Sequence, residues 1–142
     1  MNSTTAMDFI DTNILLYRIS SDPNEREKQR IASDLLERDD LCLSVQVLQE
    51  FYVQATRESR DDALRHDEAC DLIASWNRFH IQETTVQLFH ASIAAKQRWR
   101  ISFWDAAIIE AARLQESTLV YSEDLNDGQD FDGVLVKNPF HV

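Results

Sequence analysis

Glycine, proline and cysteine each occur only twice in the 142 residues. With glycine only at positions 128 and 133, the chain cannot form a Gly-rich phosphate-binding loop. The scarcity of glycine and proline also argues against linkers and low-complexity segments. No repeat or break in composition divides the sequence, so we expect a single domain over residues 1–142, long enough for a substantial core.

The sequence has no apolar run near the ~20 residues of a membrane span. Residues 1–6 are polar and lack the basic and apolar segments of a signal peptide, so we expect a flexible tail there, with Met7 as an alternative start. Nothing indicates that the two cysteines, Cys42 and Cys70, pair in an oxidising compartment. A cytoplasmic protein without membrane contact is therefore expected.

Basic residues are few: 14 Lys and Arg stand against 25 Asp and Glu, which gives a formal net charge of −11. This balance argues against a general nucleic-acid binder, because such proteins are basic. Most of the basic residues are arginines, which bind phosphate better than lysines do. Bound divalent cations would cancel part of the acidic excess, so a nuclease with low non-specific affinity for RNA is not excluded.

Strand-like and helix-like segments alternate along the chain. The expected strands are 7–11, 41–43, 79–82, 118–121 and 134–136. The expected helices are 13–19, 24–38, 45–57, one opened by Asp61-Asp62, 86–99 and 103–116, with Ser44, Thr85 and Ser102 as N-caps. This alternation predicts an α/β fold in which helices cover both faces of a parallel sheet.

Two carboxylates follow predicted strands. Asp11 closes the run Met7-Asp8-Phe9-Ile10, and Asp124 follows Leu119-Val120-Tyr121 by three residues. Ligands of open α/β sheets bind at the carboxyl ends of strands. Carboxylates that gather there repel one another unless a cation neutralises them, and their hard oxygens suit Mg²⁺ or Mn²⁺. The sequence therefore predicts a metal-dependent hydrolase.

Asp105 breaks the pattern of the helix expected at 103–116. It shares a face with Ile108 and Ala112, whereas Glu110 and Arg113 are expected on the solvent side. A carboxylate on an apolar face is unfavourable unless something pairs with it. One interpretation is a functional acid, and the other is helix capping, since Ser102-x-x-Asp105 resembles a capping box.

The other acids also have purely structural interpretations. N-capping of the next helix would by itself explain Asp11. Asp124 can be an ordinary turn aspartate. Glu50 lies off the apolar face of its helix, where a solvated side chain is the default. Spacing alone does not separate these interpretations from a metal site.

The ordered motifs Phe9-Ile10-Asp11-Thr12-Asn13, Glu50, Phe103-Trp104-Asp105-Ala106 and Ser122-Glu123-Asp124-Leu125-Asn126-Asp127-Gly128 extend over nearly the whole chain. In this order they resemble PIN-domain ribonucleases, and among them the VapC-type toxins of bacterial toxin–antitoxin pairs. The resemblance implies a three-layer α/β/α fold with a five-stranded parallel sheet in the order 3-2-1-4-5.

The resemblance also implies site residues and partners. Asp11, Glu50, Asp105 and Asp124 would bind Mg²⁺ or Mn²⁺, with Asp127 as a candidate auxiliary ligand and Thr12 and Ser122 in supporting roles. The implied activity is hydrolysis of phosphodiester bonds in structured RNA, such as tRNA or rRNA, by metal-activated water. A homodimer and a cognate antitoxin protein are the implied partners.

Two other functions are compatible with an acidic sheet edge. A phospho-acceptor switch domain needs an aspartate at the end of the third strand, and His80-Ile81-Gln82-Glu83 supplies none. A non-catalytic protein-binding module is the second alternative, and failure to bind Mn²⁺ would favour it.

Overall fold

The computed structural model describes residues 6–141, so the tail expected at 1–6 lies, except for Ala6, outside the described residues. Five strands form one parallel sheet in the order β3-β2-β1-β4-β5. Their bounds are β1 (Asp8–Ile10), β2 (Leu41–Ser44), β3 (His80–Gln82), β4 (Leu119–Tyr121) and β5 (Leu135–Lys137). The predicted fold class and the strand order 3-2-1-4-5 are confirmed.

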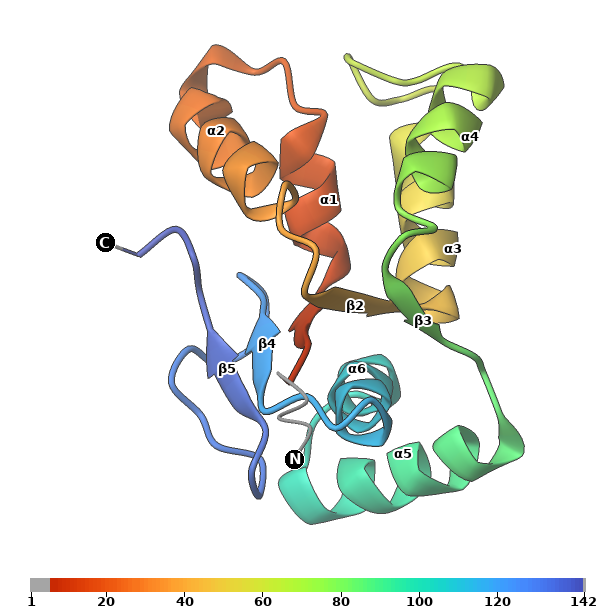
Figure 1. Cartoon of the computed structure of the whole chain (residues 1–142), viewed down its shortest axis with the longest axis vertical. Coiled ribbons are helices and arrows are strands. Elements are labelled where there is room, and N and C mark those ends of the chain that lie inside the picture. The colour runs from red at the N-terminus through yellow and green to blue at the C-terminus, as the bar shows by residue number, and fades with distance from the viewer. Residues whose placement is uncertain (1–5, 142) are drawn as a thin grey trace.

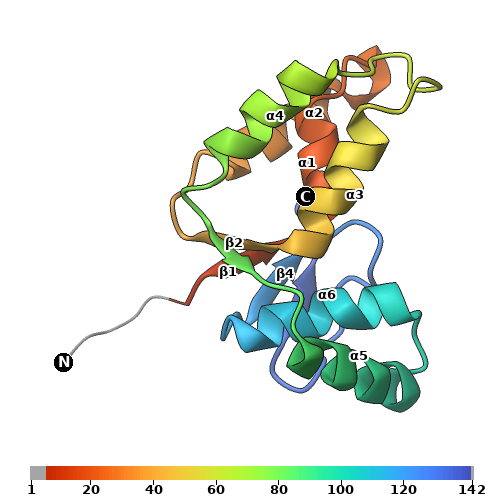
Figure 2. The same cartoon turned by 90° about the vertical axis from the view of Figure 1, so that its right-hand side faces the viewer.

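The helices of the described chain are α1 (Thr12–Arg18), a 3-10 helix (Pro23–Glu25), α2 (Arg26–Leu35), α3 (Val45–Ala55), α4 (His66–Ser75), α5 (Val86–Trp99) and α6 (Phe103–Leu114). Figure 1 shows α1–α4 above the sheet and α5 and α6 below it. The perpendicular view in Figure 2 shows the same three layers.

The two central strands carry most of the core. Phe9, Ile10, Leu41 and Leu43 are fully buried, because helices cover both faces of β1 and β2. Central strands of parallel sheets therefore have continuous apolar sequences. The edge strand β5 instead alternates, with Val136 buried and its two neighbours exposed.

Side-chain caps fix where the helices begin. The hydroxyl groups of Ser44, Thr85 and Ser102 accept hydrogen bonds from backbone N–H groups in the first turns of α3, α5 and α6, as predicted. Asp11 caps α1 in the same way. Helices α1 and α3 therefore start directly at the carboxyl ends of β1 and β2, which places their first turns at one edge of the sheet.

Two predicted helices have the wrong bounds. The segment Asp61-Asp62 does not open α4, because the Asp62 carboxylate accepts hydrogen bonds from Ser21 and pairs with Arg60 in the preceding loop. Helix α4 begins four residues later. The helix predicted at 24–38 is divided into the 3-10 helix and α2, which ends at Leu35.

The prediction that Glu110 faces solvent is also wrong. Glu110 is 8% exposed and pairs with Arg113 at 3.1 Å. Arg113 also donates hydrogen bonds to the backbone oxygens of Phe131 and Asp132. The segment before β5 therefore covers this side of α6, and an intrahelical ion pair makes the burial of Glu110 tolerable.

No helix within residues 6–141 is long and apolar enough to cross a membrane. Both cysteines are free thiols, Cys42 buried and Cys70 exposed. Burial raises the pKa of the Cys42 thiol to about 11. Cys42 is therefore an unreactive core residue next to Ser117.

Candidate active site

Asp11 lies at the carboxyl end of β1 and is only 7% exposed. Its Oδ1 accepts a hydrogen bond from the Thr12 backbone N–H at 2.7 Å, and its Oδ2 accepts one from the Ser122 hydroxyl at 2.8 Å. Burial raises the pKa of Asp11 to about 6, and the negative charges of Asp124 and Glu50 add to this rise. The two hydrogen bonds oppose the shift. Asp11 is therefore a buried carboxylate inside an acidic cluster.

Ser122 and Asn13 connect Asp11 to Asp124. The Asn13 amide donates to Asp124 Oδ2 at 3.2 Å and to Asp11 Oδ2 at 3.4 Å. The Ser122 oxygen accepts the backbone N–H of Asp124 at 3.1 Å. Asn13 also accepts the N–H of Glu123, which joins α1 to the loop after β4. Ser122 and Asn13 therefore both lie between Asp11 and Asp124.

Glu50 reaches this cluster from α3, although its position off the apolar face of the helix suggested a solvated side chain. Its Oε2 accepts a hydrogen bond from the Thr12 hydroxyl at 3.1 Å. Its Oε1 accepts one from the Gln46 amide at 2.7 Å. Thr12 thus links Glu50 to Asp11, because its hydroxyl binds Glu50 and its backbone N–H binds Asp11. The solvated interpretation of Glu50 does not hold.

Asp105 lies in the first turn of α6. The Ser102 hydroxyl accepts the Asp105 backbone N–H at 3.0 Å, so Ser102 is the cap. The Asp105 carboxylate is half-buried and forms no hydrogen bond or ion pair within residues 6–141. One bond brings its helix near Glu50: Gln46 donates to the backbone oxygen of Trp104 at 3.3 Å. Capping by Ser102 therefore leaves the Asp105 carboxylate available.

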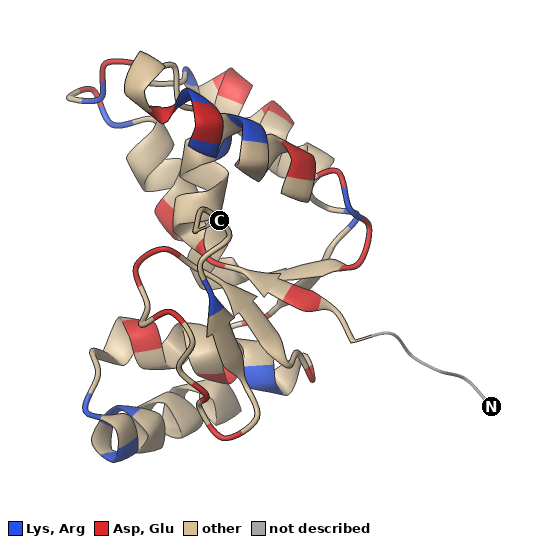
Figure 3. Cartoon of the chain, turned by 90° about the vertical axis from the view of Figure 1, so that its left-hand side faces the viewer, with Lys and Arg blue, Asp and Glu red and all other residues tan. Residues whose placement is uncertain are grey.

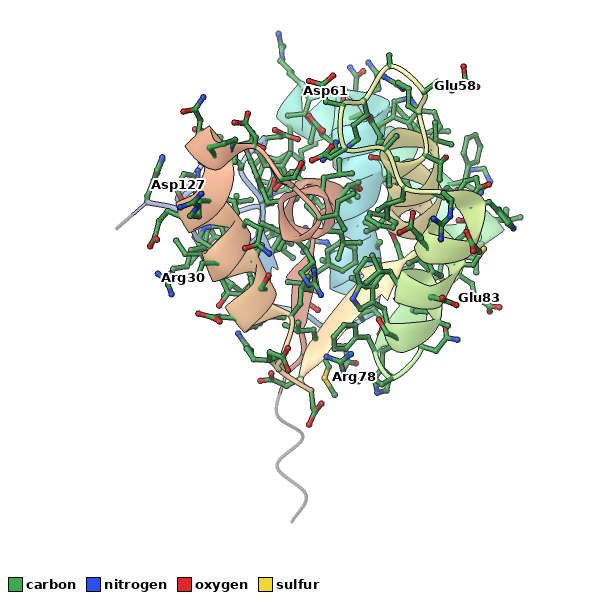
Figure 4. The ribbon with its side chains drawn as sticks, turned by 90° about the horizontal axis from the view of Figure 1, so that it is seen from above. Arg30, Glu58, Asp61, Arg78, Glu83 and Asp127 are labelled. Atoms are coloured by element: carbon green, nitrogen blue, oxygen red, sulfur yellow. The ribbon has the colours of Figure 1, made fainter. Side chains whose placement is uncertain are left out.

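Asp127 does not join Asp11, Glu50 and Asp124. Its carboxylate accepts the backbone N–H of Asn138 at 2.8 Å and contacts His141 Nδ1 at 3.1 Å. These contacts lower the pKa of Asp127. In Figure 4 it lies at the side of the molecule occupied by α2. Both carboxylate oxygens of Asp127 therefore bind the segment after β5.

Glu123, between Ser122 and Asp124, is held by α1 and α2. Its carboxylate accepts hydrogen bonds from the hydroxyl of Tyr17 and from the ammonium group of Lys28. The hydrogen bond from Lys28 is the strongest of the effects that lower its pKa, and together they outweigh the opposing effect of burial. Glu123 is therefore neutralised locally, unlike the neighbouring Asp11.

The donor chemistry of the cluster fits a hard divalent cation. Asp11, Glu50 and Asp124 offer only carboxylate oxygens, and the contributions that lower the pKa of Asp11 are hydrogen bonds rather than a basic side chain. In the described part of the chain, no three acidic, histidine or cysteine side chains form a ready-made metal cage. Hydroxyl and amide groups of Thr12, Asn13 and Ser122 lie between the acids, as expected for like charges that repel.

Sequence reasoning missed Asn13 and Gln46. Asn13 belongs to the Asp-Thr-Asn motif, so its place after a strand-end aspartate was a usable signal. Gln46 had no such signal, because its role depends on the approach of α6 to α3. It is one turn before Glu50 and connects that residue to Trp104.

Solved structures of similar fold include several toxin proteins. A toxin–antitoxin complex from Klebsiella pneumoniae aligns with a TM-score of 0.68 and 21% identity, over 95% of this chain and 99% of that chain. VapC20 of Mycobacterium tuberculosis, described as a sarcin–ricin loop cleaving toxin, gives 0.60 and 18% identity, over 82% and 89%. DNA-bound VapBC from Salmonella typhimurium gives 0.64 and 15%, over 95% and 99%. At these identities the likeness shows the fold.

No curated protein matches the amino-acid sequence. The pattern of the PIN domain matches residues 9–129, a span that contains Asp11, Glu50, Asp105 and Asp124. Because this match covers well over half of the sequence, the chain belongs to the PIN domain family, whose members are nucleases.

Proposed function

We propose that this chain is a divalent-metal-dependent endoribonuclease and the toxin of a bacterial toxin–antitoxin pair. The observation that carries the proposal is the position of Asp11, buried beside Glu50 and Asp124 with its pKa raised to about 6. A buried carboxylate beside two further acids is destabilising without a cation. Perturbed carboxylates at the carboxyl edge of an α/β sheet are typical of functional sites.

Each acid has a distinct part in the proposed site. Asp11, Glu50, Asp105 and Asp124 would hold Mg²⁺ or Mn²⁺, and Asp127 is left out because both its oxygens are engaged with the segment after β5. When bound, the cation lowers the pKa of a water molecule toward neutrality and neutralises charge on the phosphate. Thr12 and Ser122 hold Glu50 and Asp11 through their hydroxyl groups. This chemistry needs no histidine and no 2′-hydroxyl attack.

The proposed partners follow from the similar proteins. VapC20 is described as cleaving the sarcin–ricin loop, and the Klebsiella and Salmonella structures contain toxins with antitoxins or DNA. For this chain we propose structured RNA, tRNA or rRNA, as substrate and a cognate antitoxin as inhibitor. A homodimer is also proposed, and an exposed apolar stripe on α5 formed by Val86, Phe89 and Ile93 supports it.

The test is expression in bacteria. Wild type and Asp11→Asn are induced separately, growth is followed, and RNA 5′ ends are sequenced. We expect growth arrest and new 5′-phosphate ends at a few RNA sites with the wild type only. Asp127→Asn is the matched control, since it removes an aspartate charge outside the cluster, and it should remain toxic. Equal toxicity of Asp11→Asn would contradict the nuclease proposal, and indiscriminate degradation would contradict the narrow substrate.

A further inference from the structure

A pocket of about 450 Å³ lies beside Glu50. Its volume is within the range of about 300–1,000 Å³ that is usual for small-ligand sites. Helix α3 supplies five lining residues and α6 supplies one: Gln46, Gln49, Glu50, Val53, Gln54 and Trp104. The pocket is thus continuous with the proposed catalytic cluster through the shared residue Glu50.

Trp104 is the most unusual residue of this pocket. Its side chain is 65% exposed, whereas the other two tryptophans, Trp76 and Trp99, are buried or half-buried. Trp104 contacts Phe103 edge-on, with ring centroids 5.1 Å apart. The bond from Gln46 to the Trp104 backbone fixes the start of α6 against α3. An indole is therefore held at the pocket with most of its surface open to solvent.

Two glutamines add polar groups to a lining whose surface is mainly apolar. Gln49 and Gln54 are exposed, and within residues 6–141 their side-chain amides have no intramolecular partner inside the pocket. Each amide offers both a donor and an acceptor. Val53, 57% exposed, supplies an apolar patch between them. An aromatic face beside free amide groups matches an unpaired nucleobase, which stacks on aromatic rings and presents donors and acceptors on its edges.

A second copy of the chain fits this pocket less well. An interface between copies would bury two glutamine amides and the Glu50 carboxylate against a surface that must supply a partner for each. The apolar stripe of Val86, Phe89 and Ile93 on α5 is better suited to such an interface. The glutamine amides beside Trp104 favour a ligand that carries its own donors and acceptors.

We propose that Trp104, with Gln49 and Gln54, forms a subsite that binds an unpaired base of the RNA next to the bond that is cut. This inference rests on the proposed nuclease function and adds the feature by which the enzyme selects its substrate. Trp104 stacks on the base and the glutamines contact its edge. The subsite restricts cleavage to RNA segments in which a base can leave its helix.

The test measures binding without cleavage. Fluorescently labelled pentaadenylate, pentauridylate and an abasic pentamer of the same phosphate number are titrated into the full-length protein in EDTA. Wild type is compared with Trp104→Leu and Trp104→Phe, and Leu135→Ala on β5 serves as a control outside the pocket. The wild type should bind the base-containing pentamers more tightly than the abasic one.

Trp104→Leu should weaken binding of the base-containing pentamers by about 5- to 150-fold, the range for loss of one base–aromatic stack, and leave the abasic pentamer unaffected. Trp104→Phe keeps a ring and should stay close to wild type. Gln49→Met should lose about 2- to 12-fold, as expected for one hydrogen bond. Equal binding of the abasic and base-containing pentamers by wild type, or no effect of Trp104→Leu, would overturn the subsite.

Sedimentation of the same variants tests whether the pocket is instead a contact between two copies of the chain. If wild type is a dimer and Trp104→Leu is a monomer, the pocket is a contact between copies and the proposal is wrong. If the wild type binds the pentamers as described but cleaves no RNA in Mg²⁺, the proposed nuclease function fails while the base-binding pocket stands. If RNA is cleaved and Trp104→Leu binds as wild type does, only the subsite fails.

Discussion

Replacing Asp11 by asparagine should stabilise the metal-free protein at neutral pH. Burial and the charges of Asp124 and Glu50 raise the pKa of Asp11 from 3.8 to about 6. Because the folded-state pKa lies above the unfolded value, the protonated group contributes stability below about pH 4, and this stability is lost as pH rises through about 6. Asparagine resembles the protonated acid and carries no charge at any pH.

The magnitude follows from linkage. One pKa unit corresponds to about 1.4 kcal/mol, so the shift of Asp11 corresponds to about 3 kcal/mol lost in full above pH ~7. About 2 kcal/mol of this loss falls between pH 4.5 and pH 7.5. The unfolding free energy of Asp11→Asn minus that of wild type should therefore grow by about 2 kcal/mol across this window. Taking the difference removes the pH dependence that both proteins share.

Urea unfolding in EDTA at four pH values measures this difference. Asp127→Asn is the matched control, because the pKa of Asp127 is lowered. A lowered pKa contributes stability that is lost only below the usual aspartate range, so the Asp127→Asn difference should stay flat from pH 4.5 to pH 7.5. A flat difference for Asp11→Asn would mean that the acid cluster is not electrostatically strained, which would refute the reasoning.

Three further outcomes are expected. Mg²⁺ or Mn²⁺ at a hundredfold excess over its dissociation constant should raise the unfolding free energy by about 2.7 kcal/mol for one site, and melts that do not shift at millimolar metal would contradict the site. Asp105→Asn should abolish RNA cleavage yet change the unfolding free energy by no more than about 0.5 kcal/mol, since the carboxylate makes no structural bond; global unfolding of this variant would favour a capping role. Ser122→Ala should lower the unfolding free energy by about 1–3 kcal/mol in urea melts, because buried Ser122 accepts the backbone N–H of Asp124 and of Leu125; an unchanged midpoint would show that these bonds are dispensable.

The fold was predictable because its signals are local. The apolar strands and the serine and threonine caps depend on neighbouring residues, and α5 begins and ends where its capping residue and periodicity place it. The start of α4 failed for the opposite reason. Asp61-Asp62 resembles a helix start, but the Asp62 carboxylate accepts a hydrogen bond from Ser21, 41 residues earlier, and pairs with Arg60. Long-range contacts of this kind leave no mark in the local sequence.

Some residues of the candidate site were also predictable from local sequence, and others were not. Asp11 and Asp124 were found because they follow strands, and strand ends of a parallel sheet meet at one edge. Asp105 was selected on the assumption that Glu110 faces solvent, and that assumption was wrong. The position of Glu50 carried no such signal, so only the family resemblance identified it. Its contact with Thr12 arises from the packing of α3 beside α1, which periodicity does not encode.

The acidic charge of the chain and the proposed RNA substrate can be reconciled through the arginines. Seven arginines of the described chain, at positions 30, 38, 60, 65, 78, 98 and 113, are in ion pairs with acidic side chains. On the side shown in Figure 3, basic residues are scattered among acidic ones rather than gathered on one face. Few phosphates can then be neutralised, so general affinity for RNA is low. A cation at the acid cluster and stacking of a base on Trp104 would supply the affinity for RNA that the surface charges do not. Both contacts can form together only at one position of a suitable RNA.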